Sequence, residues 1–262
     1  MKKRFFALLC IGVTLWCLQG CSSSYADKKE TEEKKPSASV PVDVAINSPY
    51  APFVYKENGE VKGFDVDVLQ AIAHEMNWDI RIHQESWDDV FAKVKNGTYD
   101  IGASGITITK DRKKEFLFSP SYFASYPLTV MKKEIKVTDI SLLKGKRIAV
   151  QTDTTGQDFV KQQFGADYNG VVAFSEMNET FDAYFKGDVD AIVGDNAVIF
   201  DYLKDKQNEN YVLVKSKQAP LEYLGFMVNK HNKHLQKQLS VGIQRIQSNG
   251  VYDKIYANYF GK

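Results

Sequence analysis

The sequence predicts an α/β protein of two lobes, each built around a mostly parallel sheet. Strand and helix signals alternate from Val42 onward, which is the pattern of parallel sheets with crossover helices. The alternation falls into two series, one starting at Val42 and one near Arg147, and each is the size of a small α/β unit. With 262 residues, 44% hydrophobic and 13% aromatic, the chain has enough apolar side chains for one or two cores.

The first series contains three strands and two helices. Asp65 is placed to cap a helix, because the apolar residues over 68–76 recur at helical spacing. A second helix is marked by Val90 and ends at Asn96-Gly97. The expected strands lie at 42–46, 80–82 and 101–104.

The second series repeats this pattern. A Thr/Gly loop over 153–156 leads into a helix, and a further helix over 196–203 directly follows a strand. A long helix over 235–246 is broken by Asn249-Gly250 and followed by a last amphipathic turn over 252–259. The expected strands lie at 147–150, 171–174, 191–193 and 223–229.

Residues 1–20 have the layout of a secretory signal peptide. Lys2, Lys3 and Arg4 precede an apolar run over 5–18 that is too short to span a bilayer. The Leu-Gln-Gly ahead of Cys21 resembles the lipobox of bacterial lipoproteins, in which the cysteine is diacylated and begins the mature chain. This resemblance implies an exported protein anchored to the outer face of the cell membrane. An ordinary cleaved signal with an incidental cysteine is the alternative.

The use of cysteine agrees with a lipid anchor. Cys10 and Cys17 lie inside the signal peptide, so the mature chain keeps only Cys21 and no disulfide framework is expected. Two acyl chains would hold the protein firmly to a membrane, where one would bind only marginally. Residues 21–40 are rich in Ser, Lys, Glu and Asp, which predicts a disordered tether. The rest of the sequence contains no run of about 18 apolar residues, so no membrane span is predicted there.

Charge and histidine placement argue against several functions. The net charge is +1 and basic and acidic residues are interspersed, so no nucleic-acid partner is expected. The histidines form no set suited to a metal site or a catalytic triad, and no cofactor is expected. They are His74, His83, His231 and His234.

Polar and aromatic residues gather in loops that follow four of the expected strands. In α/β sheets ligands bind at the carboxyl ends of strands. An α-amino acid needs donors for its carboxylate and acceptors for its ammonium group. Arg112 suits the carboxylate because a guanidinium binds it bidentately, and the helix start at Thr155 adds backbone N–H groups. Asp195 suits the ammonium group. The candidates in these loops, with the nearby Trp87, are Tyr50, Ser104, Thr107, Arg112, Thr154, Thr155 and Asp195.

Six short segments resemble, in the same order, segments of the polar amino acid-binding proteins of ABC importers. Each is weak alone, but together they cover nearly all of residues 42–262. The segments are Tyr50-Ala51-Pro52-Phe53, Gly63-Phe64-Asp65-Val66-Asp67, Ser104-Gly105-Ile106-Thr107-Ile108-Thr109 with Arg112, Thr154-Thr155-Gly156, Asp195-Asn196-Ala197, and Ser248-Asn249-Gly250-Val251-Tyr252 with Tyr259-Phe260-Gly261-Lys262.

The resemblance implies a two-lobed, periplasmic-binding-protein-like (type II) fold with the ligand cleft between the lobes. Crossovers near Val130 and Pro220 would give a first lobe of 41–130 plus 221–262 and a second lobe of 131–220. It also implies a free L-amino acid as ligand and the permease and ATPase of an ABC transporter as partners.

Individual roles follow from the same resemblance. Tyr50 and Trp87 would sandwich the ligand side chain. Thr107 and Arg112 would clamp the ligand carboxylate from the first lobe, with Thr155 added from the second.

The remaining roles concern the ammonium group and specificity. Ser104, the Gly105 carbonyl and Asp195 would hold the ammonium group. Asn47 stands where relatives that bind lysine or arginine often have an acidic residue. The Ser-Gly-Ile-Thr-Ile-Thr run with Trp87 is most like the arginine and basic amino acid members. The resemblance therefore implies a basic amino acid (arginine, lysine or histidine), with glutamine as the alternative.

Other interpretations stay open at this point. A dehydratase on the same fold would need a positioned acid or base, and the sequence indicates no histidine or buried Glu pair near these loops, which favours a non-enzyme. A sensor domain would need a membrane output, which is not seen before the chain ends at Lys262. Ordinary structural roles, as core aromatics, a basic turn, a helix cap and turn residues, remain for Tyr50, Trp87, Arg112, Asp195, Thr154 and Thr155.

Overall fold

The computed structural model describes residues 38–135, 139–206 and 210–261. The predicted signal peptide (1–20), the lipidation site Cys21 and most of the predicted tether lie outside the described residues. Strand β1 (Val40–Ile46) already includes Val40, the last residue of that tether. In the described part of the chain, no helix has both the length and the apolar content needed to cross a membrane.

The first lobe is built on a five-stranded sheet with the order β4-β1-β5-β14-β6. Strand β1 pairs in parallel with β4 and β5, whereas β14 is antiparallel to both β5 and β6. The sheet is therefore mixed rather than purely parallel. Its other strands are β4 (Trp78–Gln84), β5 (Ile101–Gly102), β6 (Phe116–Phe118) and β14 (Met227–Asn229).

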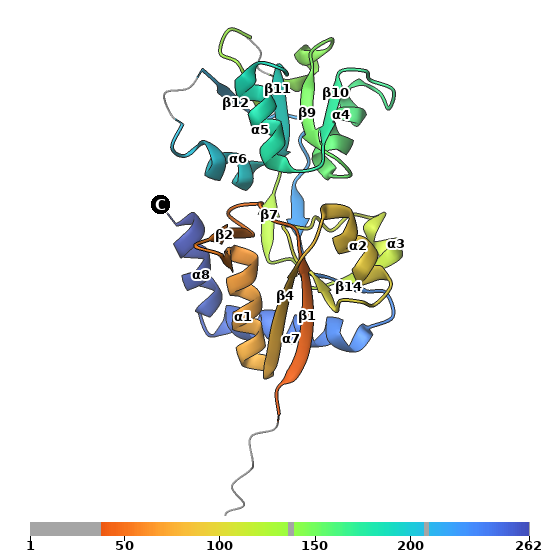
Figure 1. Cartoon of the computed structure of the whole chain (residues 1–262), viewed down its shortest axis with the longest axis vertical. Coiled ribbons are helices and arrows are strands. Elements are labelled where there is room, and N and C mark those ends of the chain that lie inside the picture. The colour runs from red at the N-terminus through yellow and green to blue at the C-terminus, as the bar shows by residue number, and fades with distance from the viewer. Residues whose placement is uncertain (1–37, 136–138, 207–209, 262) are drawn as a thin grey trace, which may run out of the picture. The chain divides into compact units, whose positions relative to one another are not determined.

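Helices cover both faces of this sheet because the side chains of β1 alternate between them. Val44 and Ile46 pack in the same core as helix α1 (Phe64–Met76) and helix α7 (Lys233–Ser248). Ala45 faces the other way, toward helix α2 (Trp87–Lys95). Helix α8 (Val251–Phe260) lies beside α1 (Figure 1).

The predicted cap of α1 is wrong. The helix begins at Phe64, and the residue at its N-cap is Gly63, whose backbone φ is 133°. No side chain caps the helix. A side chain there would collide with the backbone of Phe53, so glycine is required. Asp65 instead turns its fully buried side chain away from the helix end, toward the loop after β5.

The second lobe is built on another five-stranded sheet, with the order β10-β9-β11-β8-β12. Strand β9 pairs in parallel with β10 and β11, and β8 is antiparallel to β11 and β12. Helix α4 (Thr155–Phe164) covers one face, and helices α5 (Met177–Lys186) and α6 (Asn196–Leu203) cover the other (Figure 1). The strands are β8 (Pro127–Met131), β9 (Ile148–Gln151), β10 (Val171–Phe174), β11 (Ala191–Asp195) and β12 (Val212–Val214).

Two short antiparallel strands, β7 (Phe123–Ser125) and β13 (Glu222–Leu224), carry the chain between the sheets. The segment before Val130, predicted to belong to the first lobe, pairs in the second sheet from Pro127 onward. The single strand predicted over 223–229 is two strands, because β13 pairs with β7 while β14 joins the first sheet.

Three small elements complete the first lobe and one the second. A hairpin joins β2 (Tyr55–Glu57) to β3 (Glu60–Lys62), and a single helical turn, α3 (Arg112–Glu115), precedes β6. A 3-10 turn over Ile140–Leu143 precedes β9. The prediction of a two-lobed α/β fold is confirmed, and the antiparallel strands are those that the crossovers feed into each sheet.

Candidate functional site

The predicted site residues meet where the carboxyl ends of strands from the two sheets come together. Asn47 directly follows β1, and Ser104 and Gly105 follow β5. From the other sheet, Thr155 begins the helix after β9, and Asp195 is the last residue of β11. Hydrogen bonds between the two groups show that they are in direct contact.

Arg112 is held at this junction by backbone oxygens of both lobes. Its guanidinium donates to the Thr107 carbonyl at 3.0 Å and to the Asp153 carbonyl at 3.2 Å. The charge also lies 5.5 Å from the centre of the Trp87 ring and 4.9 Å from that of Phe91, where cation–π attraction favours it. Burial lowers the pKa of Arg112, and Asp195 is the strongest of the acids that oppose this effect. The interpretation of Arg112 as part of a solvated basic turn is therefore wrong.

Two threonine hydroxyls from opposite lobes meet beside Arg112. The Oγ1 atoms of Thr107 and Thr155 lie 3.5 Å apart. Both hydroxyls donate to Oε2 of Glu222, Thr155 at 2.9 Å and Thr107 at 3.4 Å. Burial, with the nearby charge of Asp195, raises the pKa of Glu222 to about 7. Glu222 belongs to crossover strand β13, and no motif in the sequence indicated it.

Asp195 accepts hydrogen bonds from the first lobe and from crossover strand β7 rather than capping a helix. Its residue position is the N-cap of α6, but its side chain makes no capping bond. The carboxylate accepts from the Tyr50 hydroxyl on one oxygen and from the Ser125 hydroxyl at 3.1 Å on the other. Burial raises the pKa of Asp195, which these two hydrogen bonds oppose. The structure thus brings two buried carboxyl groups, Asp195 and Glu222, to the junction, although the sequence indicated no such pair.

Gly105 is positioned by Asp65. The Gly105 N–H donates to one oxygen of the Asp65 carboxylate at 2.8 Å, and the Tyr122 hydroxyl donates to the other at 2.8 Å. Gly105 has a φ of 59°, and a side chain there would press against the ring of Tyr50. A glycine is required for both reasons.

At the other end of the site, Asn47 bridges the two lobes. Its amide donates to the Glu85 carbonyl at 3.2 Å and to Oε1 of Glu176 at 3.2 Å. Its backbone N–H and carbonyl are both bonded to the hydroxyl of Ser104, at 2.7 and 3.0 Å. The Ser104 hydroxyl therefore supports the backbone of Asn47, a different role from the predicted one toward an ammonium group.

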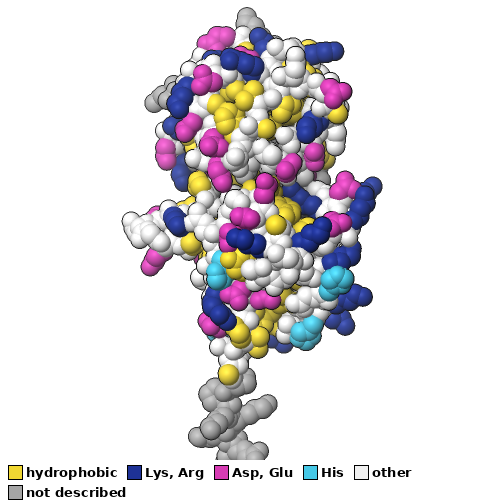
Figure 2. Space-filling view, turned by 45° about the vertical axis from the view of Figure 1, so that its right-hand side comes forward, with side chains coloured by type: hydrophobic (Ala, Val, Ile, Leu, Met, Phe, Trp, Pro, Cys, Tyr) yellow, Lys and Arg dark blue, Asp and Glu magenta, His cyan; other side chains and the backbone are white. Residues whose placement is uncertain are grey.

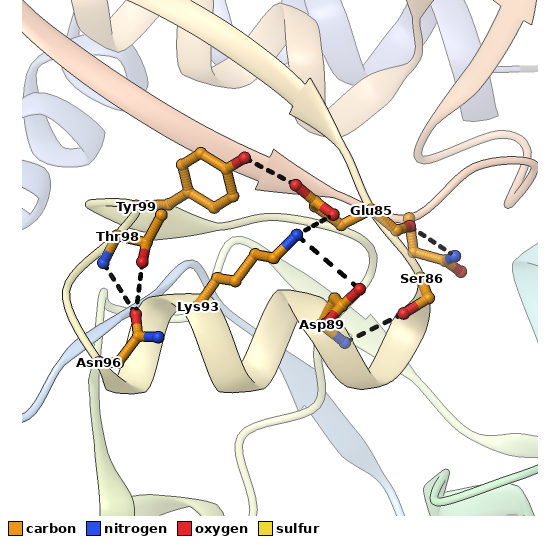
Figure 3. A network of polar contacts seen from close by, with 8 residues as sticks. Glu85, Ser86, Asp89, Lys93, Asn96, Thr98 and Tyr99 are labelled. Atoms are coloured by element: carbon orange, nitrogen blue, oxygen red, sulfur yellow. Dashed lines mark hydrogen bonds and ion pairs between the residues drawn. The ribbon is translucent and has the colours of Figure 1, made fainter.

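The carboxylate of Glu85 is already neutralised (Figure 3). It pairs with the Lys93 ammonium and accepts from the Tyr99 hydroxyl at 2.6 Å, and the side chain of Lys93 also reaches Asp89 at 3.8 Å. These partners belong to helix α2 and the loop behind it. Glu85 therefore contributes a carbonyl to the site but no free charge.

The structure separates the remaining candidates by where their polar atoms go. The Trp87 indole N–H donates to the Asp153 carbonyl at 3.4 Å, so this ring faces the second lobe. The Thr154 hydroxyl donates to the Gln151 carbonyl at 2.8 Å and accepts from the Gln157 N–H, so its side chain caps helix α4. The turn interpretation of Thr154 agrees with this contact better than the ligand interpretation does.

Surface charge is mixed around the junction. On the face shown in Figure 2, basic and acidic side chains are interspersed over both lobes, with no large area of one sign. This agrees with the balanced composition. Four charged side chains lie at the junction, and they form part of the candidate site and not of an extended charged surface. They are Arg112, Asp195, Glu222 and Glu176.

Comparisons with known proteins identify the family. The model of the bacterial extracellular solute-binding proteins, family 3, matches residues 42–262. An arginine-binding periplasmic protein of Mannheimia haemolytica is 33% identical over 223 residues, which are 84% of this chain and 91% of the relative. The crystal structure of the arginine-, lysine-, histidine-binding protein ArtJ from Geobacillus stearothermophilus has a TM-score of 0.81 and 33% identity, covering 85% of this chain and 96% of that one. An ancestral arginine-binding protein bound to glutamine has a TM-score of 0.78 and 32% identity, covering 85% and 98%. The chain belongs to the bacterial extracellular solute-binding proteins, family 3.

Proposed function

We propose that this protein binds a free L-amino acid with a basic side chain and delivers it to the permease and ATPase of an ABC transporter. The observation that carries the proposal is that a guanidinium, Arg112, and two hydroxyls, Thr107 and Thr155, meet at the junction that also holds a buried carboxylate, Asp195. Donors for a carboxylate and an acceptor for an ammonium group thus converge from two lobes, as a zwitterion requires.

Each polar group of the ligand has partners in this arrangement. Arg112 and the hydroxyls of Thr107 and Thr155 bind its carboxylate, aided by the N-terminus of helix α4. Asp195 binds its ammonium group, together with the carbonyl of Gly105. Tyr50 and Trp87 contact its side chain from the first lobe. The named substrates of the arginine-binding relative and of ArtJ favour a basic side chain.

Closure around the ligand follows from the division of these groups between the lobes. Tyr50, Thr107 and Arg112 lie on the first lobe, and Thr155 and Asp195 on the second, so a ligand that contacts both sets favours the closed form. A ligand shifts such an equilibrium only by its difference in affinity for the two forms. We therefore propose a hinge at β7 and β13, which carry the chain between the lobes.

A thermal-shift screen of the purified protein against the twenty amino acids tests the proposed function. We expect arginine, lysine or histidine to raise the midpoint of unfolding most, because a ligand that binds only the folded form adds roughly 4 kcal/mol at a thousandfold excess over its dissociation constant. The ligand should be recovered unchanged, since the proposed role is binding and not catalysis. Failure of every amino acid to shift the midpoint would contradict the proposal, and conversion of a bound acid would favour an enzyme.

Glutamine is the second candidate. The neutral Asn47 replaces the acidic residue expected for a cationic ligand, and an ancestral arginine-binding protein of the same fold was solved with glutamine. The same screen separates the two candidates, since glutamine would then give the largest shift.

The predicted signal peptide and Cys21 support a further part of the proposal, namely anchoring to the outer face of the cell membrane by a lipid on this cysteine. Changing Cys21 to Ser should leave the protein unanchored or as an unprocessed precursor, because the thioether to the diacyl group cannot form. Fractionation of the host cells and mass spectrometry of the mature N-terminus measure both outcomes. An unmodified Cys21 in the native protein would show that the anchor is absent.

A further inference from the structure

One carboxylate at the junction, that of Glu176, forms no ion pair with any residue that the structure describes. Glu176 lies at the N-terminus of helix α5 and is half-buried. Its Oε1 accepts from the Asn47 amide at 3.2 Å, whereas its Oε2 is buried and has no hydrogen-bond partner among the described residues. A buried oxygen without a donor is costly unless a partner arrives.

The two acids at this end of the site differ in how they are compensated. Glu85 is paired with Lys93 and Tyr99 (Figure 3). Glu176 forms no ion pair within the part of the chain that the structure describes, and the negative charge of Glu179 acts on it. Burial raises the pKa of Glu176, the charge of Glu179 adds to this effect, and the hydrogen bond from Asn47 opposes it. A cation from outside the chain is the group that would relieve both the burial and the repulsion.

We propose that the Glu176 carboxylate binds the cationic end of the ligand side chain and so determines the preference for basic amino acids. The inference rests on the proposed function and identifies the residue that recognises the side chain of the ligand. Position 47 holds a neutral Asn where relatives that bind lysine or arginine often have an acid. Here Glu176 of the facing lobe, whose Oε1 accepts a hydrogen bond from the Asn47 amide, supplies the carboxylate. An ammonium or guanidinium placed there would donate to a carboxylate in charge-assisted hydrogen bonds.

The position of Glu176 on the second lobe adds a consequence. Asn47, Trp87 and Arg112 are on the first lobe, so a ligand held by that lobe alone does not reach Glu176. A cationic side chain therefore gains its partner only when the lobes close, which links the preference for basic ligands to closure.

A purely structural role for Glu176 makes a different prediction. Glu176 and Glu179 form a capping box, in which the Glu176 N–H donates to the Glu179 carboxylate at 3.0 Å. Glutamine at position 176 keeps an acceptor oxygen for the helix while removing the charge. If the carboxylate serves only the helix, Glu176→Gln should change the affinities for arginine and glutamine equally.

Calorimetric titration of arginine, lysine and glutamine into the parent and Glu176→Gln is the test. We expect arginine and lysine to bind at least about tenfold more weakly to the variant, because a charge-assisted hydrogen bond is lost, while glutamine binds as before or better. Asp182→Asn is the matched control, because Asp182 is an exposed acid of the same helix, and it should leave the ratio of arginine to glutamine affinity unchanged.

A second variant moves the charge to the other lobe. Asn47→Asp combined with Glu176→Gln should restore much of the preference for arginine, since the acid again faces the same position. An unchanged ratio of arginine to glutamine affinity in Glu176→Gln would overturn the inference, even though the parent binds amino acids. Absence of binding by the parent would instead overturn the proposed function.

Discussion

Replacing Arg112 by alanine is expected to weaken the binding of every amino acid ligand by at least about a hundredfold. The guanidinium would make two charge-assisted hydrogen bonds to the ligand carboxylate, at roughly 1.5–3 kcal/mol each, and a tenfold change in affinity is about 1.4 kcal/mol. The loss should be uniform across ligands because all of them carry the same carboxylate. Arg112 is also held in place by two backbone carbonyls and two aromatic rings, so little side-chain entropy remains to be lost on binding.

The control for this substitution is Arg245→Ala. Arg245 is an exposed arginine on helix α7 whose guanidinium donates to the Glu75 carbonyl at 2.8 Å, far in the sequence from the junction. The Arg245→Ala variant should bind ligands as the parent does. Arg112→Lys should fall between the two, because the ammonium keeps the charge but not the bidentate geometry. If Arg112→Ala binds ligands as tightly as the parent while remaining folded, the carboxylate is held elsewhere and the assignment of the site fails at its centre.

The two-lobed fold could be predicted because its signals are local. The alternation of strand and helix follows from runs such as the residues of β9 and β11, and the polar loops after them meet because parallel strands end at the same edge. Tyr50, Thr107, Arg112 and Asp195 come together for this reason. Strand pairing at the crossovers is not local, and this is why the crossover predicted near Val130 falls within β8 and why β13 and β14 were taken as one strand.

The residues that sequence reasoning missed lie outside recognisable loops. Glu222 belongs to a crossover strand, and its contact with Thr155 joins residues far apart in the chain. Glu176 forms a capping box with Glu179 in the structure, where its carboxylate also accepts from the amide of Asn47 in the facing lobe, and the sequence analysis indicated neither contact. Asp65 was taken as a helix cap because of its place before an apolar run. In the structure its carboxylate instead accepts a hydrogen bond from the buried backbone N–H of Gly105.

Glu222 predicts a dependence of stability on pH. Its ordinary pKa is 4.5, and burial with the charge of Asp195 raises the pKa in the folded protein to about 7. Between these values the folded state binds a proton that the unfolded state releases, so the free energy of unfolding falls as the pH rises. The favourable contribution is complete below the unfolded pKa and is lost as the pH passes through the folded value. Asp65, whose pKa burial also raises to about 7, acts in the same direction.

Glu222→Gln should therefore flatten the pH profile. The shift in the pKa of Glu222 corresponds to a loss of at most roughly 3 kcal/mol in the free energy of unfolding between about pH 5 and pH 8. The variant should not show this loss, whereas the loss that comes from Asp65 should remain. Denaturant unfolding of both proteins across this range, without ligand, measures the difference. Glu57→Gln, on the β2–β3 hairpin, is the control: its partner Lys62 lowers the pKa of Glu57, and this exposed pair contributes little to stability, so the fall with pH should stay as in the parent. A parent and a Glu222→Gln variant with the same fall in unfolding free energy would mean that Glu222 is ionised at the junction throughout this range, with Arg112 and the two threonine hydroxyls compensating its burial.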